Sequence, residues 1–274
     1  MNVMFAANDY LVDGLELAIW TLLKHNHNTE VNIYVATMNI RLIEKDTGIT
    51  HNYRTIDDDQ RNWLRKIVSY VGQGRANITF IDCAESYHKY LENSVNALTG
   101  FTPYASIRLL ADIIFPDIDD LLYLDADTAI QGPLESMYNK YIYENKYCMA
   151  GSFAYDAREG KGELVSGVLV MNLKRMREEK FLERARDNYN KNEYIYPDQF
   201  ALEEAGECER LPETYGYMFE LENCFYTPII LHFTNKLKPK IYNAGGKEKF
   251  YKRYPQFKYV EDGMKLLSNL DITF

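Results

Sequence analysis

The stretch LLYLDADT, residues 121–128, does most to decide the fold. Four apolar residues lead directly into two aspartates, Asp125 and Asp127, a pattern typical of a buried strand that ends at a polar edge. In open α/β sheets the carboxyl ends of the strands face the ligand crevice. Residues two apart in an extended segment project to the same side, so both carboxylates could reach one cation, and the small Ala126 leaves room for a ligand. An Asp-x-Asp triplet alone is also common on solvated loops of an acid-rich chain, and only the preceding apolar run favours the strand exit.

Short β-rich runs alternate with helical patterns on both sides of this stretch. The predicted strands are residues 3–7, 31–36, 77–82, 121–125 and 165–173, with further candidates at 209–218 and 228–233. The predicted helices are residues 13–25, a segment around Trp63 after a polar loop at 46–62, then 104–115, 175–190 and one that opens within 196–202. This alternation predicts an α/β fold with a mixed, mostly parallel central sheet that helices cover on both faces.

The composition narrows the class of protein. The chain has 274 residues, 46% hydrophobic and 26% charged, which is a globular balance that suits one large domain. Its net charge of −9 argues against a nucleic-acid partner, because phosphate binding needs a basic face. The four cysteines form no C-x-x-C pair, so reduced structural thiols are favoured over zinc. The start reads as a strand and no run of about 18 apolar residues occurs, so we predict a cytoplasmic protein without a spanning helix.

A second signal is IILHF, residues 229–233, which places His232 at the end of another apolar strand, with Lys238 six residues later. An imidazole can bind a transition metal, and a nearby lysine can neutralise a phosphate. Each residue alone is more often structural or solvated. Two oxygen ligands and one imidazole would favour Mn²⁺ over Mg²⁺, with Mg²⁺ left open as the alternative cofactor.

Taken together, these segments resemble retaining glycosyltransferases of family 8, the group that contains bacterial lipopolysaccharide galactosyltransferases and glycogenin. The resemblance runs from the N-terminus to about residue 239. Its pieces, in order, are FAANDY at 5–10, Tyr104 to Arg108, FPD at 115–117, LLYLDAD, SGVLVMNL at 166–173, Asp198 with Gln199, and HFTNKLKP at 232–239. It implies a Rossmann-like fold of the GT-A type, with a domain over residues 1–240 and an appendage over residues 241–274.

The resemblance also implies roles for individual residues. Asp125, Asp127 and His232 match the metal ligands, and Lys238 matches the diphosphate contact. Ala6, Asn8, Asp9 and Tyr10 match the segment that holds uridine, with the tyrosine ring stacked on the base; a strand exit followed by a helix cap is the plain alternative. Arg108 matches a contact on the donor-sugar side, and its alternative is an ion pair on a helix surface. Asp198 and Gln199 match the catalytic pair beneath the reactive carbon, and an N-cap is the alternative for Asp198.

Some positions depart from the family pattern. Val165 and Ser166 stand where galactosyltransferase relatives have Asn and Ala, and Asn235 replaces a glycine, which leaves the choice of galactose or glucose open. The implied reaction moves a hexose from a UDP-sugar to a saccharide or lipid-linked saccharide acceptor, in the synthesis of lipopolysaccharide or another cell-surface polysaccharide. Gln199 is neutral and therefore a poor nucleophile, so front-face attack with retention is favoured over a covalent adduct.

The segment from residue 236 to 258 combines eight basic residues with aromatic ones and a single acid. Such a mixture suits either peripheral contact with the inner face of a membrane or an ordinary solvated helix. The sequence leaves the oligomeric state open.

Two other functions remain as alternatives. A haloacid-dehalogenase-type phosphatase also presents two aspartates after an apolar strand, although Ala129 stands where its motif has Thr or Val. A non-catalytic nucleotide-sugar-binding protein would keep the fold without turnover.

Overall fold

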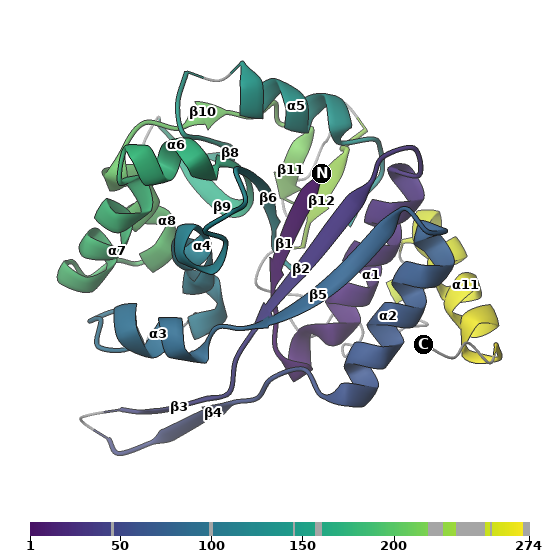
Figure 1. The fold of residues 1–274 in the computed structure, drawn as a ribbon, viewed down its shortest axis with the longest axis horizontal. Coiled ribbons are helices and arrows are strands. Elements are labelled where there is room, and N and C mark those ends of the chain that lie inside the picture. Colours follow the sequence, from purple (N-terminus) through teal and green to yellow (C-terminus); the bar gives the residue numbers. More distant parts are fainter. Residues whose placement is uncertain are drawn as a thin grey trace.

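The computed structural model describes residues 1–44, 47–98, 101–144, 146–156, 161–218, 227–233, 250–252 and 254–270. Its centre is a seven-stranded mixed sheet. The strands are β1 Asn2–Ala6, β2 Val31–Thr37, β5 Ala76–Asp82, β6 Asp120–Leu124, β8 Met149–Asp156, β9 Lys161–Asn172 and β10 Glu209–Arg210. Their order is β10-β8-β9-β6-β1-β2-β5 (Figure 1). The strands β6, β1, β2 and β5 run parallel, and β9 runs antiparallel to β6 and β8, so the predicted mixed, mostly parallel sheet is confirmed.

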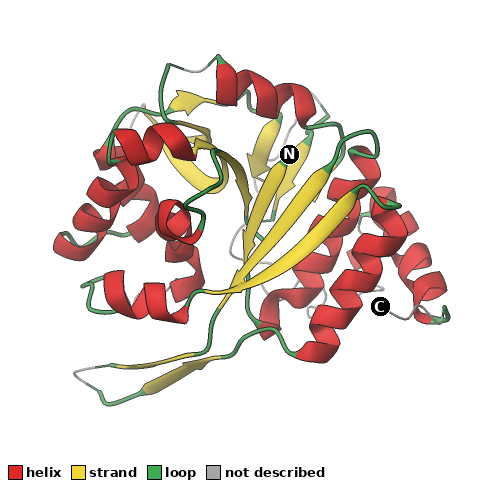
Figure 2. Cartoon of the chain, in the orientation of Figure 1, coloured by secondary structure: helices red, strands yellow, loops and turns green. Residues whose placement is uncertain are grey.

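Helices cover both faces of the sheet (Figure 2). One face packs against α1 Val12–His25, α2 Asp58–Gly72, α5 Glu135–Tyr143 and α11 Lys258–Ser268. The other packs against α3 Ala84–Tyr90, the 3-10 helix η2 Pro103–Leu110, α4 Ala111–Ile114, α6 Leu173–Glu178, α7 Phe181–Lys191 and α8 Pro197–Ala205. Two shorter 3-10 helices are η1 Asp9–Leu11 and η3 Pro255–Phe257.

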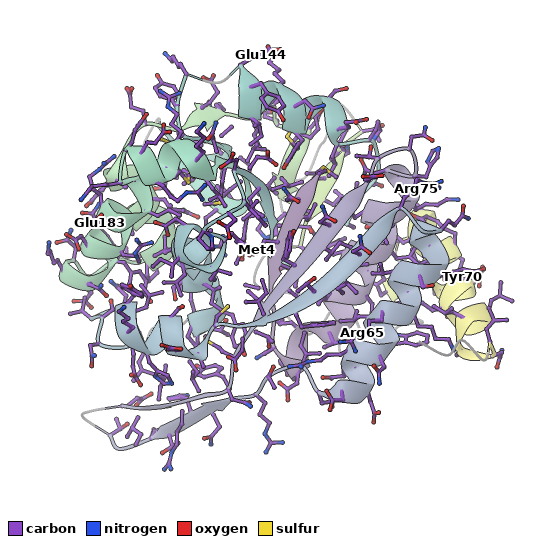
Figure 3. The ribbon with its side chains drawn as sticks, in the orientation of Figure 1. Met4, Arg65, Tyr70, Arg75, Glu144 and Glu183 are labelled. Atoms are coloured by element: carbon purple, nitrogen blue, oxygen red, sulfur yellow. The ribbon has the colours of Figure 1, made fainter. Side chains whose placement is uncertain are left out.

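Alternation along the strands divides the core into these two layers. In β1, Val3 and Phe5 enter one hydrophobic cluster, whereas Met4 and Ala6 enter the other, as the two-residue period of a strand requires. Figure 3 shows Met4 at the middle of the sheet and Glu183 at the outside of the molecule. A strand that is buried on both faces needs apolar residues at every position, which is why β1 reads as a continuous apolar run.

Three predicted elements differ from the structure. The predicted loop at 46–62 overlaps an antiparallel hairpin, β3 Ile40–Ile43 with β4 Thr50–Tyr53, which projects from the body of the molecule (Figure 1). The predicted helix at 104–115 is mostly the 3-10 helix η2, followed by the single turn α4. The predicted helix at 175–190 is divided into α6 and α7, because Lys180 adopts a left-handed conformation with φ of 54°.

A second, three-stranded sheet has the order β11-β12-β7. Its strands are β7 Thr128–Ile130, β11 Tyr215–Met218 and β12 Ile230–His232. β12 lies antiparallel to β7, with Ile230 opposite Ile130 and His232 opposite Thr128. This small sheet brings the end of β12 beside the loop that follows β6.

The described part of the C-terminal segment packs on the body of the protein. α11 contacts α1 and α2, and the side chains of Phe250, Tyr251, Tyr254 and Phe257 are buried in the same hydrophobic cluster as α1. These four rings therefore face the protein core and are not available to lipid. The division of the chain at residue 240 stays a prediction, as does membrane contact through the basic residues. Among the described residues, no helix is both long enough and apolar enough to cross a bilayer.

Candidate metal and donor site

The two aspartates lie in the tight turn between β6 and β7. Thr128 closes this turn, since its backbone N–H and its hydroxyl both donate to the carbonyl of Asp125, at 3.2 and 2.8 Å. The backbone N–H of Asp125 donates to the carbonyl of Gly167 on β9 at 2.9 Å. Asp127 is only 2% exposed. The turn thus holds both carboxylates at the carboxyl end of β6, as the sequence predicts.

His232 reaches the same place from the other end of the chain. Pairing of β12 with β7 sets its position, and the N–H of the next residue, Phe233, donates to the carbonyl of Asp127 at 2.9 Å. The Nε2 atom of His232 lies 3.4 Å from Oδ2 of Asp125 and 3.3 Å from Oδ1 of Asp127. One ligand atom from each of the three residues lies within 4.8 Å of the others. The structure therefore brings together the three predicted metal ligands.

The electrostatics of this cluster suit a cation. Burial alone would lower the pKa of His232, but the carboxylates of Asp127 and Asp125 outweigh burial and raise this pKa to about 9. Two buried acids beside one imidazole make a strongly negative environment, which a divalent ion would neutralise. Two carboxylate oxygens and an imidazole nitrogen are a donor set that transition metals accept. The residues present thus fit a metal.

Gly167 is a site residue that the sequence analysis missed. A Cβ atom at this position would lie 2.2 Å from Cε1 of His232 and 2.8 Å from its Nε2. Such distances are far inside van der Waals contact, so only glycine leaves space for the imidazole. The sequence predicts that SGV at 166–168 is part of a strand, and a glycine inside a strand is a known sign of close approach.

Arg108 lies beneath the cluster and is 2% exposed. Its guanidinium donates to Oδ1 of Asp125 at 2.8 Å and to the backbone carbonyls of Ala105 and Ser166, and it lies 4.3 Å from the ring centroid of Tyr123. Burial opposes its charge, but Asp125 and its other neighbours raise the pKa of Arg108 above its usual value. The plain alternative of a surface ion pair is wrong, because this arginine is buried among the site residues.

Tyr123 is a second site residue that the sequence motifs do not identify. Its hydroxyl donates to Oδ1 of Asp125 at 2.9 Å. Because Tyr123 precedes Asp125 by two residues in an extended segment, both side chains project to the same side. That spacing was the signal that could have identified it.

Asp198 lies in the first turn of α8 and is buried. The Ser166 hydroxyl donates to Oδ2 of Asp198 at 2.7 Å, and Nε of Arg108 lies 3.2 Å from the same oxygen. The N-cap of α8 is Tyr196, which makes no side-chain capping bond, so capping is not the role of Asp198. Arg108 thus bridges Asp198 and Asp125 of the Asp125–Asp127–His232 cluster. Gln199, the next residue, is half-buried.

The predicted uridine segment lies at the carboxyl end of β1. β1 and β6 are parallel neighbours, so this segment and the aspartates share one edge of the sheet. Ala6 and Asn8 are buried, and Oδ1 of Asn8 has no hydrogen-bond partner within the described part of the chain. Asp9 and Tyr10 lie in η1, where the Tyr10 ring is 63% exposed. An exposed ring beside a buried amide oxygen suits a planar, polar ligand such as a base.

The remaining predicted site residues are Ala126 and Lys238. Ala126 is buried between the two aspartates. Lys238 lies outside the described residues.

Comparisons with known proteins agree with this arrangement. The mixed α/β fold with its central, mostly parallel sheet is that of GT-A glycosyltransferases. The chain belongs to glycosyl transferase family 8, whose sequence pattern matches residues 2–241. The family resemblance drawn from the motifs is therefore confirmed.

Individual relatives are distant. A putative glycosyltransferase of Haemophilus influenzae is 21% identical over 214 residues, which are 74% of this chain and 58% of that protein. The chain thus spans little more than half the length of this relative.

Solved structures share the fold. The galactosyltransferase LgtC in complex with donor and acceptor sugar analogues has a TM-score of 0.64 at 15% identity, covering all of this chain and 98% of LgtC. The bifunctional WbbM has a TM-score of 0.64 at 14% identity over 86% of this chain and 46% of its own. GlyE of Streptococcus pneumoniae TIGR4 has a TM-score of 0.61 at 19% identity, covering 98% of this chain and 62% of GlyE.

Proposed function

We propose that the protein is a metal-dependent retaining glycosyltransferase that moves a galactose or glucose residue from a UDP-sugar to a saccharide or lipid-linked saccharide. The observation that carries this proposal is the convergence of Asp125, Asp127 and His232, within 4.8 Å, at the sheet edge where β1 also ends. Membership of glycosyl transferase family 8 supports it and favours it over the phosphatase alternative.

The three residues would hold a divalent cation, and the imidazole favours Mn²⁺ over Mg²⁺. When bound, such an ion stabilises the negative charge that develops on a departing diphosphate. All three residues are at most 9% exposed, so their charges are screened less than they would be in water. Lys238 is proposed as the diphosphate contact from the family resemblance alone.

The donor would lie along the edge formed by the ends of β1 and β6. The exposed ring of Tyr10 would stack on uracil, and the buried Oδ1 of Asn8, which has no hydrogen-bond partner among the described residues, would accept a hydrogen bond from the nucleoside. Ala6 and Asp9 would border the same ligand.

On the sugar side, Arg108 and Ser166 hold the carboxylate of Asp198 in one orientation. A fixed carboxylate favours positive charge on the sugar as its bond to the diphosphate breaks. Gln199 is neutral and would orient the sugar instead of attacking it, which favours front-face transfer with retention. These roles for Asp198 and Gln199 are part of the proposal.

The test compares Asp127→Ala with Asp187→Ala, which removes an exposed aspartate of α7. UDP release from UDP-galactose and UDP-glucose is measured with Mn²⁺ and with EDTA. We expect Asp127→Ala to lose turnover by roughly a hundredfold or more, whereas Asp187→Ala keeps it. An unchanged rate in Asp127→Ala would refute the metal assignment. A wild-type protein that binds UDP-sugar without any turnover would instead support the non-catalytic binding protein.

A further inference from the structure

The residue after the proposed metal ligand is a buried anchor. Phe233 is fully buried, and its ring centroid lies 5.8 Å from that of Phe250 and 5.6 Å from that of Tyr254. Since the residues of a strand alternate in direction, His232 and Phe233 occupy opposite sides of the chain. The imidazole meets the aspartates while the phenyl ring meets an aromatic cluster.

This aromatic cluster comes from the C-terminal segment. Phe250, Tyr251, Tyr254 and Phe257 are all buried. Their rings contact one another, with centroids 5.2 Å apart for Phe250 and Tyr251, 4.8 Å for Phe250 and Tyr254, and 6.3 Å for Phe250 and Phe257. All four lie beyond residue 241, where the family match ends. The anchor for Phe233 is thus made by residues that the family pattern does not include.

The strand that carries His232 is short and ends beside the aspartate turn. β12 has three residues and lies between β11 and β7, and just beyond it the N–H of Phe233 donates to the carbonyl of Asp127 at 2.9 Å. Short strand ends fray unless side-chain packing holds them. Burial of the Phe233 ring fixes the backbone at the position from which His232 projects.

We infer that the aromatic cluster of Phe250, Tyr251, Tyr254 and Phe257 positions the proposed metal site: by packing against Phe233, it holds His232 within reach of Asp125 and Asp127. The inference rests on the proposed metal-dependent function. Residues that support a metal ligand from outside typically change metal affinity by about tenfold to a hundredfold when altered. Coupling between two sites is reciprocal, so metal binding must in turn hold the C-terminal segment more firmly on the body.

The first experiment uses two Phe→Leu variants of equal chemistry. Phe250→Leu removes one ring from the aromatic cluster that packs on Phe233. Phe181→Leu, the control, removes an equally buried ring of α7 in the opposite core layer. Mn²⁺ is titrated by electron paramagnetic resonance in the presence of UDP. We expect Kd for Mn²⁺ to rise about tenfold in Phe250→Leu and to stay at the wild-type value in Phe181→Leu. Equal Kd values in the two variants would overturn the inference that the aromatic cluster positions His232. Absence of Mn²⁺ binding by the wild-type protein would instead overturn the proposed function itself.

The second experiment needs no variant and decides the matter if Phe250→Leu does not fold. Amide hydrogen exchange is followed in the wild-type protein with and without Mn²⁺ and UDP. We expect Mn²⁺ with UDP to slow exchange in residues 254–267 and to leave α7 unchanged. Exchange in residues 254–267 that is insensitive to the metal would overturn the inference, even if Mn²⁺ binds.

Discussion

Residue 167 is a glycine, and its lack of a side chain determines whether the imidazole of His232 can enter the site. Gly167 gives His232 its space, because any Cβ atom there would lie 2.2 Å from the ring. We therefore expect Gly167→Ala to displace His232 and to weaken Mn²⁺ binding by about tenfold or more. Electron paramagnetic resonance titration in the presence of UDP measures the loss.

The control is Gly151→Ala, in which the added Cβ lies 2.5 Å from Cδ1 of Leu164, the far end of a flexible side chain. Circular dichroism is used to check that both variants fold. If Gly167→Ala binds Mn²⁺ as tightly as Gly151→Ala, the steric account of Gly167 is wrong.

At this scale the sequence predicts residues whose chemistry is local. Asp125 and Asp127 follow an apolar run, and His232 follows another, so a strand-exit argument reaches all three. Ser166 could not be reached in this way, since its role depends on α8 bringing Asp198 against β9. A contact between two elements that are distant in the chain cannot be recognised from the sequence of either element alone.

A hydrogen bond from the start of α2 restrains the backbone of the predicted uridine segment. Asp57 and Gln60 form a capping box, in which the Asp57 side chain accepts from the N–H of Gln60 at 2.8 Å and the N–H of Asp57 donates to Oε1 of Gln60 at 3.1 Å. The amide of Gln60 also donates to the carbonyl of Asp9 at 3.1 Å. Gln60 therefore joins the α2 cap to η1.

This link can be tested by separating the two roles. We expect Gln60→Ala to raise KM for the UDP-sugar by roughly two- to tenfold, the worth of one hydrogen bond, because Asp9 and Tyr10 lose a restraint. Asp57→Ala should lower the free energy of unfolding by about 1 kcal/mol but leave KM unchanged. Steady-state kinetics and urea unfolding measure the two effects, and equal KM values in both variants would contradict the link.

The sequence predicts the type of an element correctly where a clear hydrophobic periodicity extends over several turns, as it does in α1. The hairpin β3–β4 was missed because β4, THNY, has little apolar character and is held by pairing with β3. The break between α6 and α7 was missed because Lys180 is neither Gly nor Asn, the usual left-handed residues. For η2 the spacing of Tyr104, Ile107 and Leu110 fits a three-residue period as well as a helical one, so a short segment does not separate the two.

At the scale of the whole molecule, ligand binding must stabilise the folded state. Mn²⁺ with UDP at about one hundred times Kd should raise the free energy of unfolding by about 2.7 kcal/mol, which corresponds to a rise in Tm of roughly 5 to 10 °C. We expect EDTA to remove most of this shift, because the proposed site binds the nucleotide together with the ion. Differential scanning fluorimetry measures it, and an equal shift in EDTA would exclude metal-linked nucleotide binding.

The sequence predicts a mixed, mostly parallel sheet, but it does not predict the order of the strands within that sheet. Alternating strands and helices gave a parallel centre, which β6, β1, β2 and β5 form. The antiparallel strand β9 between β6 and β8 has the same apolar character as its parallel neighbours. Strand direction depends on the connections between strands, and residue type along a buried strand carries little information about it.

The pairing of β12 with β7 has a consequence for synthesis. The aspartate turn leaves the ribosome long before His232, a delay on the order of ten seconds at typical rates of translation. During that interval the nascent chain carries the two carboxylates without the imidazole, and a chain that stops before His232 lacks one of the three proposed metal ligands. We therefore expect the proposed ion to bind only after residue 232 has been synthesised.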